Sequence, residues 1–161
     1  MAKKPTSNEP YRKVISQNRR ARFEYFIEET LEAGIMLTGS EVKSLRAGKA
    51  NISEAFAHIE DNALYLHNMH IDQYKQATRW NHAERRPRKL LLHAKEIKRF
   101  IGLLQTKGLT MVPLSIYFNA RNIVKVELGL AKGKKLHDKR ETEKKRDWQR
   151  QKNRLLKGGN S

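Results

Sequence analysis

The sequence predicts a mainly β protein with added α-helices, arranged as a small closed antiparallel barrel with two or three helices and a basic C-terminal tail. Apolar and polar residues alternate in short segments, and these segments occur as pairs separated by brief turns. Long helices do not alternate with the segments, so a parallel sheet is not expected. Closing the sheet into a barrel removes its unpaired edges.

The composition divides the 161 residues into three parts. Residues 1–17 contain Pro5 and Pro10 and few apolar residues, so we expect a flexible N-terminal arm. Residues 18–130 contain the alternating segments and form the predicted barrel. Residues 131–161 form a tail with twelve Lys and Arg against four Asp and Glu, a net charge of +8. The tail has few apolar residues, and their burial cannot offset the conformational entropy that the chain would lose on folding. We therefore expect this tail to be disordered alone.

The first predicted elements are a strand and a short helix. Residues 23–31 read as a strand, and residues 35–37 belong to the same strand or to the next. A helix is expected to open at residues 39–41, with Ser40 as its N-cap and Gly48 as its C-terminal stop.

A β-hairpin is predicted next, from the apolar segments 55–59 and 63–67 on either side of the acidic turn 60–62. Residues 72–88 are polar and irregular. We expect them to form a loop with a helical turn near Trp80.

A helix follows, because Ile97, Phe100, Ile101 and Leu104 have the i, i+3, i+4, i+7 spacing of a buried stripe. Gly108 is expected to end it.

The last predicted element of the barrel is a second hairpin. Apolar residues alternate with polar ones over residues 114–118 and again over residues 124–130, and residues 119–122 lie between them.

The charge of the chain indicates a polyanionic partner. The net charge of +17 favours nucleic acid, since each phosphate that is neutralised releases a counterion. The charge is unevenly spread, with +6 over residues 1–23, −5 over residues 24–78 and +6 over residues 79–99. We therefore expect one basic and one acidic side on the folded part.

Patterns for catalysis or metal binding are weak. The absence of cysteine excludes disulfides and Cys-ligated zinc, and it fits a reducing cytoplasm. His67 and His70 are three apart in a predicted strand, which places them on opposite faces. The acidic cluster between residues 24 and 32 lacks the Asp or His residues that would complete a nuclease site. We expect no enzyme activity, no metal and no cofactor.

Two basic runs are the best candidates for an RNA site. Residues 18–22 precede the first strand, and residues 85–89 precede three leucines. Arginine binds phosphate with two parallel hydrogen bonds, and neighbouring apolar or aromatic residues can stack on bases. The alternative interpretation is two solvated basic loops.

Five blocks of the sequence resemble the small protein B family of bacteria, whose members bind transfer-messenger RNA (tmRNA, or SsrA RNA). They lie in order along nearly the whole chain. The blocks are residues 18–27 (NRRARFEYFI), 39–50 (GSEVKSLRAGKA), 88–93 (RKLLLH), 124–135 (VKVELGLAKGKK) and 138–141 (DKRE).

The resemblance implies an oligonucleotide-binding (OB) barrel and an adaptor without catalytic activity. Members of the family bind the tRNA-like domain of tmRNA and deliver it to stalled ribosomes in trans-translation, with elongation factor Tu in the GTP state as the delivery partner. The protein body stands in for an anticodon arm. The tail enters the vacant decoding centre of the small subunit and the message channel, where it folds as a helix.

The resemblance also implies roles for individual residues. Asn18, Glu32 and Leu91 fall at positions linked to RNA binding in the family. Basic residues of the matched blocks and basic runs are expected to contact the same RNA: Arg19, Arg20, Arg22, Lys43, Arg46, Lys89 and Lys125. Residues of the tail are expected in the decoding centre and message channel: Lys132, Lys134, Lys135, His137, Asp138, Lys139, Arg140, Trp148, Leu155 and Leu156.

Two other functions remain open. The chain could be a general single-stranded RNA-binding chaperone, which would bind arbitrary single strands as well as structured RNA. It could also be a ribonuclease that uses the acidic cluster. No apolar run approaches the ~18 residues of a membrane span, so no membrane partner is expected.

Overall fold

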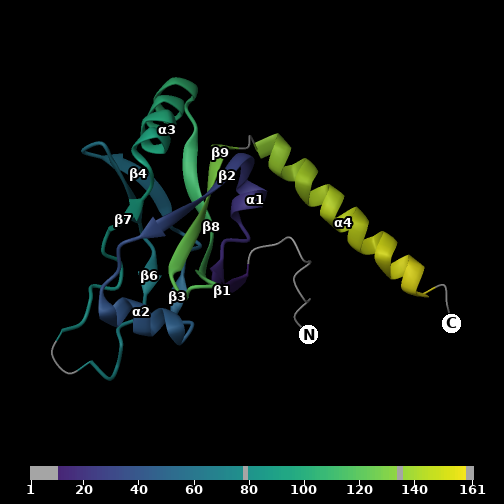
Figure 1. Cartoon of the computed structure of the whole chain (residues 1–161). Helices are drawn as coiled ribbons and strands as arrows, with labels where there is room; N and C mark the ends of the chain where they lie inside the picture. Colours follow the sequence, from purple (N-terminus) through teal and green to yellow (C-terminus); the bar gives the residue numbers. More distant parts are fainter. Residues whose placement is uncertain (1–10, 78–79, 134–135, 159–161) are drawn as a thin grey trace.

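The computed structural model describes residues 11–77, 80–133 and 136–158 (Figure 1). The elements are β1 (Arg12–Gln17), α1 (Ala21–Glu24), β2 (Tyr25–Ile35), α2 (Gly39–Arg46), β3 (Ala50–Asn51), β4 (Phe56–Glu60), β5 (Ala63–His67), β6 (His70–Ile71), β7 (Arg88–Leu91), α3 (Ala94–Lys107), β8 (Thr110–Asn119), β9 (Val124–Gly133) and α4 (Leu136–Gly158).

The main sheet is a closed antiparallel barrel, as predicted. Its strands follow the order β8-β4-β5-β7-β2-β9, and β9 pairs back onto β8 to close the ring. β8 is long enough to pair with β4 near Met111, with β9 along its length and with β1 beyond the ring. The short strands β3 and β6 form a separate pair.

The prediction of a flexible N-terminal arm over residues 1–17 is wrong for residues 12–17. These residues form β1, which pairs with β8 from Arg12↔Asn119 to Gln17↔Ser115. This strand lies at the edge of the sheet and has mostly exposed side chains. Its stabilisation comes from the backbone ladder and from Arg12, which pairs with Glu127 at 2.9 Å. Such a strand carries no apolar alternation that could reveal it in the sequence.

The strand predicted from residue 23 begins later, at Tyr25, because α1 occupies the preceding turn. β2 then continues without interruption to Ile35, so residue 35 belongs to the same strand. β2 pairs with β9 over most of its length and with β7 at its end.

The N-cap of α2 is Thr38, not Ser40 as predicted. Glu41 stands at the third helical position and accepts a hydrogen bond from the Thr38 backbone N–H at 2.9 Å, as in a capping box. Gly48 follows the helix with φ of +73°, a left-handed conformation that favours glycine, so its predicted role as a stop is confirmed.

Both predicted hairpins are present. In β4–β5, Asp61 and Asn62 take φ of 49° and 60°, which lets two residues reverse the chain. In β8–β9, the backbone of Asn119 and Ile123 closes the turn.

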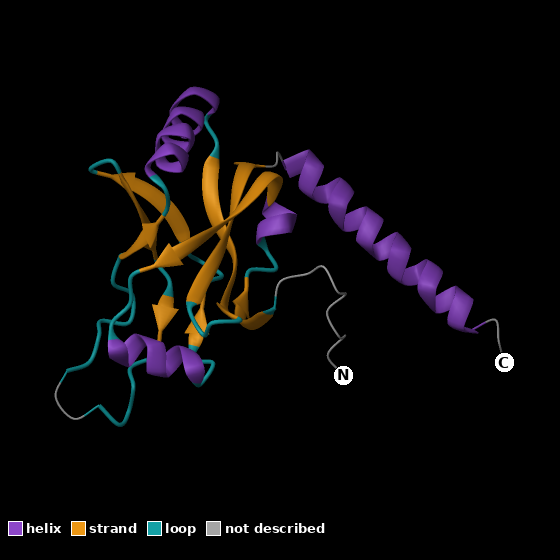
Figure 2. Cartoon of the chain, viewed as in Figure 1, coloured by secondary structure: helices purple, strands orange, loops and turns teal. Residues whose placement is uncertain are grey.

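The predicted end of the barrel at residue 130 is three residues short. β9 continues to Gly133, and Ala131 is fully buried between Ile27 and Thr110. The tail therefore leaves the barrel after Gly133 and continues as α4 (Figure 2).

The barrel is filled by aliphatic side chains from every strand of the ring, and helices flank it at two ends (Figure 1). α3 contributes Phe100, which is buried. It begins at Ala94, three residues before the predicted stripe, and it ends at Gly108 as predicted, where φ is +61°. α2 lies at the opposite end and contributes Leu45. In the described residues no helix is long and apolar enough to cross a membrane.

The predicted loop lies between β6 and β7 and makes a turn at residues 74–77, although residue 88, its last predicted residue, already belongs to β7. The turn expected near Trp80 lies partly outside the described residues, because residues 78–79 are among those not described. Asn81 closes this loop with two hydrogen bonds to the backbone of Tyr74.

Candidate nucleic-acid interface

Asn18 fixes the basic turn between β1 and α1. Its backbone N–H donates to the Leu114 carbonyl at 2.8 Å, and its Nδ2 donates to the Pro113 carbonyl at 3.1 Å. The side chain is buried, and among the described residues its Oδ1 has no hydrogen-bond partner. Asn18 therefore holds the turn against β8, while Arg19 and Arg20 next to it are exposed.

A hollow of about 750 Å³ opens beside this turn. It is lined by Asn18 and Arg20 from the turn, by Phe56 and His58 from β4, and by Thr110 from the start of β8. The Phe56 ring is 43% exposed and stacks on His67 with 5.4 Å between ring centroids. Cationic and aromatic side chains thus line one hollow, a combination that suits RNA.

A second hollow, of about 470 Å³, brings together Glu32, Leu91 and Lys125. Leu91 is 49% exposed, although its neighbour Leu90 is buried in the barrel. Gly34 pairs with Leu91, and a Cβ at Gly34 would lie 3.2 Å from the Leu91 Cβ. Three of the predicted RNA-binding residues therefore share one surface of the barrel.

Glu32 does not stand alone on an acidic face. Tyr117 donates its hydroxyl hydrogen to the Glu32 carboxylate, and the Arg12 guanidinium lies 4.5 Å from the centre of the Tyr117 ring. Burial raises the pKa of Tyr117 above its usual range, and the hydrogen bond to Glu32 adds to this shift. The phenol therefore remains a hydrogen-bond donor that orients the Glu32 carboxylate.

The structure does not bring the predicted basic residues onto one patch. Arg19 and Arg20 lie at the turn before α1, and Arg22 lies in α1. Lys43 and Arg46 are exposed on α2. Lys89 is exposed on β7, and it pairs with Tyr65 of β5 in the antiparallel ladder.

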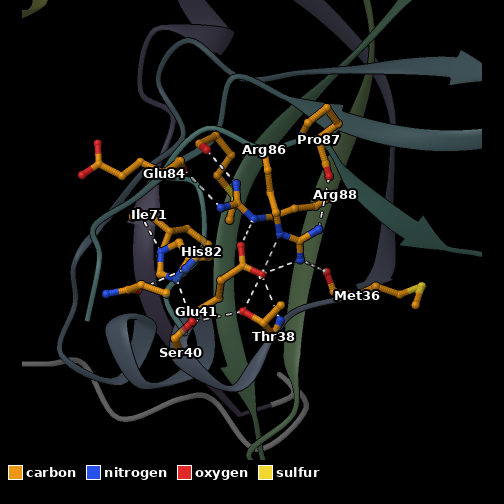
Figure 3. Close-up of polar contacts among 12 residues, drawn as sticks. Met36, Thr38, Ser40, Glu41, Ile71, His82, Glu84, Arg86, Pro87 and Arg88 are labelled. Atoms are coloured by element: carbon orange, nitrogen blue, oxygen red, sulfur yellow. Dashed lines mark hydrogen bonds and ion pairs between the residues drawn. The ribbon is translucent and has the colours of Figure 1, made fainter. Parts of the chain in front are cut away.

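The interpretation of residues 85–89 as a phosphate-binding run is wrong for two of its arginines. Arg88 is fully buried and donates from Nε to Glu41, from Nη1 to the Met69 carbonyl at 2.7 Å and from Nη2 to the Glu84 carbonyl at 3.2 Å. Arg86 donates from Nε to the same Glu41 carboxylate at 3.1 Å (Figure 3). These two guanidinium groups bind the fold rather than a ligand.

Glu41 is the centre of this network and joins α2 to β7. Burial alone would raise the pKa of Glu41, but hydrogen bonds from Arg86, the Thr38 backbone and Arg88, with the charge of Arg88, hold it below its ordinary value. Burial lowers the pKa of Arg88, and Glu41 opposes that shift. The only sequence signal for this carboxylate was its place three residues after Thr38, as in a capping box.

The tail forms α4, which lies outside the barrel (Figure 1). The Arg146 guanidinium lies 5.4 Å from the centre of the Phe23 ring of α1. Trp148, Leu155 and Leu156 are 64%, 74% and 66% exposed. The structure therefore shows as a helix a tail that was expected to be disordered alone, and it leaves these apolar side chains uncovered.

The remaining tail residues divide into three groups. Lys132 lies in β9 and is exposed, so it belongs to the barrel and not to the tail; Arg140 is exposed on α4. Lys134 and Lys135 lie outside the described residues. His137, Asp138 and Lys139 lie in α4, but their side chains are outside the described part of the chain.

Among the described residues no group of three His, Asp or Glu side chains could hold a metal ion. The Nε2 atom of His67 lies 2.9 Å from Oε1 of Glu60, and the Nε2 atom of His70 lies 2.7 Å from Oδ1 of Asp72. These histidines therefore have separate carboxylate partners.

Comparisons with known proteins agree on one family. The chain matches the family described as "SmpB protein" over residues 15–158. It is 62% identical over 146 residues to the SsrA-binding protein of Rickettsia canadensis (strain McKiel), covering 91% of this chain and 96% of that protein. The SsrA-binding protein of Rickettsia felis (strain ATCC VR-1525 / URRWXCal2) is 61% identical over the same length and coverage.

A solved structure described as "tmRNA-SmpB: a journey to the center of the bacterial ribosome" is also similar. The TM-score is 0.62 at 56% identity, over 74% of this chain and 84% of that one. With its barrel and its match from β1 to α4, the chain belongs to the SmpB protein family.

Proposed function

We propose that the protein binds tmRNA and serves the rescue of stalled ribosomes by trans-translation. The observation that carries this proposal is the identity of 62% over 146 residues with proteins named for binding SsrA, which is tmRNA. The similar solved structure, described as tmRNA-SmpB in the bacterial ribosome, supports the same partners.

The barrel is proposed to contact the tRNA-like domain of tmRNA at the two hollows. Arg19 and Arg20 would bind phosphates at the turn that Asn18 holds in place. In the second hollow, Leu91 would supply apolar contact. The oriented Glu32 carboxylate would accept hydrogen bonds from base amino groups or ribose hydroxyls there, which adds specificity rather than affinity.

We propose that the tail acts on the ribosome and not on tmRNA. Its Lys and Arg side chains would be neutralised in the decoding centre and the message channel, and Trp148 and Leu155 would gain apolar cover there. Elongation factor Tu in the GTP state is the proposed delivery partner. Delivery to ribosomes implies a cytoplasmic location and an adaptor without catalysis.

Purification of the protein from its host, followed by sequencing of the RNA that copurifies, tests this proposal. We expect tmRNA to be enriched over all other RNAs in stoichiometric amount. A mixture that follows cellular RNA abundance would instead support a general single-stranded RNA-binding chaperone. Shortened RNA after incubation with Mg²⁺ would support a nuclease.

A further inference from the structure

Trp80 is the most exposed large apolar side chain in the described part of the chain, at 88%. The loop that carries it is nevertheless closed. The next residue, Asn81, donates from Nδ2 to the Tyr74 carbonyl at 3.0 Å and accepts at Oδ1 from the Tyr74 N–H at 3.2 Å. The chain is therefore pinned directly beside the exposed indole.

The residue after the clamp is a second anchor. His82 is buried; its Nε2 donates to the Ile71 carbonyl at 2.9 Å, and its Nδ1 lies 2.9 Å from the Ser40 hydroxyl (Figure 3). The Gln73 side chain also donates to the His82 carbonyl at 3.2 Å. These contacts tie the loop to α2 and hold Trp80 away from the barrel core.

The hollow at Trp80 has a polar rather than an apolar lining. This hollow, of about 220 Å³, is otherwise lined by Thr38, Gly39, Ser40, Asn81 and His82. Nearby on α2, Lys43 and Arg46 are exposed, and the Lys43 Nζ lies 5.5 Å from the centre of the ring of Tyr74, the residue clamped by Asn81. An exposed indole at a hollow with a polar lining, one helical turn of α2 from Lys43, matches an aromatic stacking site for RNA better than a protein-binding patch.

We propose that Trp80 is a stacking platform for an unpaired base of tmRNA, and that Lys43 and Arg46 bind the flanking phosphates. This inference rests on the proposed function and adds a contact site at the α2 end of the barrel, opposite α3 (Figure 1). The Asn81 and His82 anchors already order the backbone that follows Trp80, which lowers the conformational entropy that this part of the loop loses on binding.

Fluorescence can observe this contact directly, because the chain contains only two tryptophans, Trp80 and Trp148. The Trp148→Phe variant keeps Trp80 as its single indole, and the matched Trp80→Phe variant keeps Trp148. Each full-length variant is titrated with a tmRNA transcript without ribosomes, while a mobility shift reports binding. We expect strong quenching of Trp80 emission at saturation and little change in Trp148 emission.

Affinity measurements separate stacking from charge. Trp80→Ala should weaken tmRNA binding by about 5- to 150-fold without changing the slope of log affinity against log salt, since stacking releases no counterions. Lys43→Ala should reduce that slope by about 0.7 to 0.9. Trp80→Phe should retain most of the affinity because a phenyl ring still stacks.

Three outcomes would overturn the inference: unchanged Trp80 emission on a saturated RNA complex, wild-type affinity of Trp80→Ala, or quenching that appears only after ribosomes are added. In each of these the mobility shift still shows tmRNA binding, so the proposed function stands. If no variant and no wild-type protein binds tmRNA, the proposed function itself fails.

Discussion

Leu90 and Leu91 are neighbours on β7 with opposite environments, since Leu90 is 1% exposed and Leu91 is 49% exposed. Leu91→Asp should therefore keep a cooperative thermal transition. It should weaken tmRNA binding at least about fivefold, through the loss of about 1 kcal/mol of apolar contact and the added repulsion of phosphates. Thermal melts and mobility shifts measure the two effects.

Leu90→Asp is the matched control for that variant. It places an unpaired charge in the barrel interior and should unfold the protein. If Leu91→Asp also unfolds, Leu91 is a core residue and its role in RNA binding is refuted.

Glu41 makes the free energy of unfolding depend on pH in the acidic range. Its folded-state pKa lies below its ordinary value of 4.5, so its stabilisation is fully present above that value and is lost as pH falls through the folded-state pKa. Glu41→Gln should cost about 3–5 kcal/mol near neutral pH, because buried Arg88 loses its counter-charge. The variant should also lose this group's share of the acid dependence in denaturant melts from neutral pH down to about pH 3.

Glu54→Gln serves as the comparison, because Glu54 is exposed and lies 3.4 Å from exposed Arg85. That substitution should change stability by less than about 1 kcal/mol. Equal stability losses for the two variants would show that the Glu41 network does not tie α2 to β7.

Residue roles could be predicted from the sequence only where a linear pattern carries them. Leu91 was assigned to RNA binding by its position in the matched block of residues 88–93, and the structure leaves its side chain exposed. The burial of Arg88 and the pairing of Arg86 with Glu41 depend on residues more than forty positions apart, and no local pattern reports that. A run of arginines therefore looked like a phosphate site although two of its members stabilise the fold.

The elements with periodic apolar residues were predicted well, and those stabilised by backbone or polar contacts were not. Both hairpins and α3 have clear periods. β1 has a polar face held by the β8 ladder, and α1 has only four residues, so neither produces a period. The end of β9 was placed too early because Lys132 and Gly133 continue no apolar alternation and resemble the tail in composition.

The tail should separate RNA binding from ribosome function. A chain truncated after Lys135 lacks α4 and should bind tmRNA nearly as well as the full chain, yet fail to add the peptide tag to stalled ribosomes. Trp148→Asp or Leu155→Asp should have the same effect, since each removes apolar surface that is exposed in the structure. Reconstituted tagging and mobility shifts test both statements, and tagging at full rate by the truncated chain would reduce the tail to a non-specific anchor.

Helix α4 should also depend on its partner. The helix has 23 residues, many of them charged. Among the described residues, Arg146 contacts the ring of Phe23 in α1. The structure shows α4 as a helix, but isolated helices of this kind are marginal in water. We therefore predict that this segment is a coil in the free protein in solution and a helix on the ribosome. Circular dichroism of the full and truncated chains should then show equal helical signal; a difference of some twenty helical residues would contradict this expectation.

The whole molecule distributes its charge over several contact sites, so affinity should fall steeply with salt. The slope of log affinity against log salt should shrink by about 0.7 to 0.9 for Arg20→Ala, because one phosphate contact is lost. Lys98→Ala on α3 is the matched control, exposed but outside the proposed contacts, and should leave the slope unchanged. Equal effects of the two substitutions would indicate uniform electrostatic attraction instead of a defined interface.

The most direct test of the account is a competition experiment with the full-length protein bound to the labelled tRNA-like domain of tmRNA at physiological salt. Unlabelled tmRNA should displace the label at about equimolar concentration, while an unstructured RNA of equal length should require at least about a hundredfold excess. Displacement by both RNAs at the same concentration would contradict specific tmRNA recognition, and the chain would then be a general single-stranded RNA-binding protein.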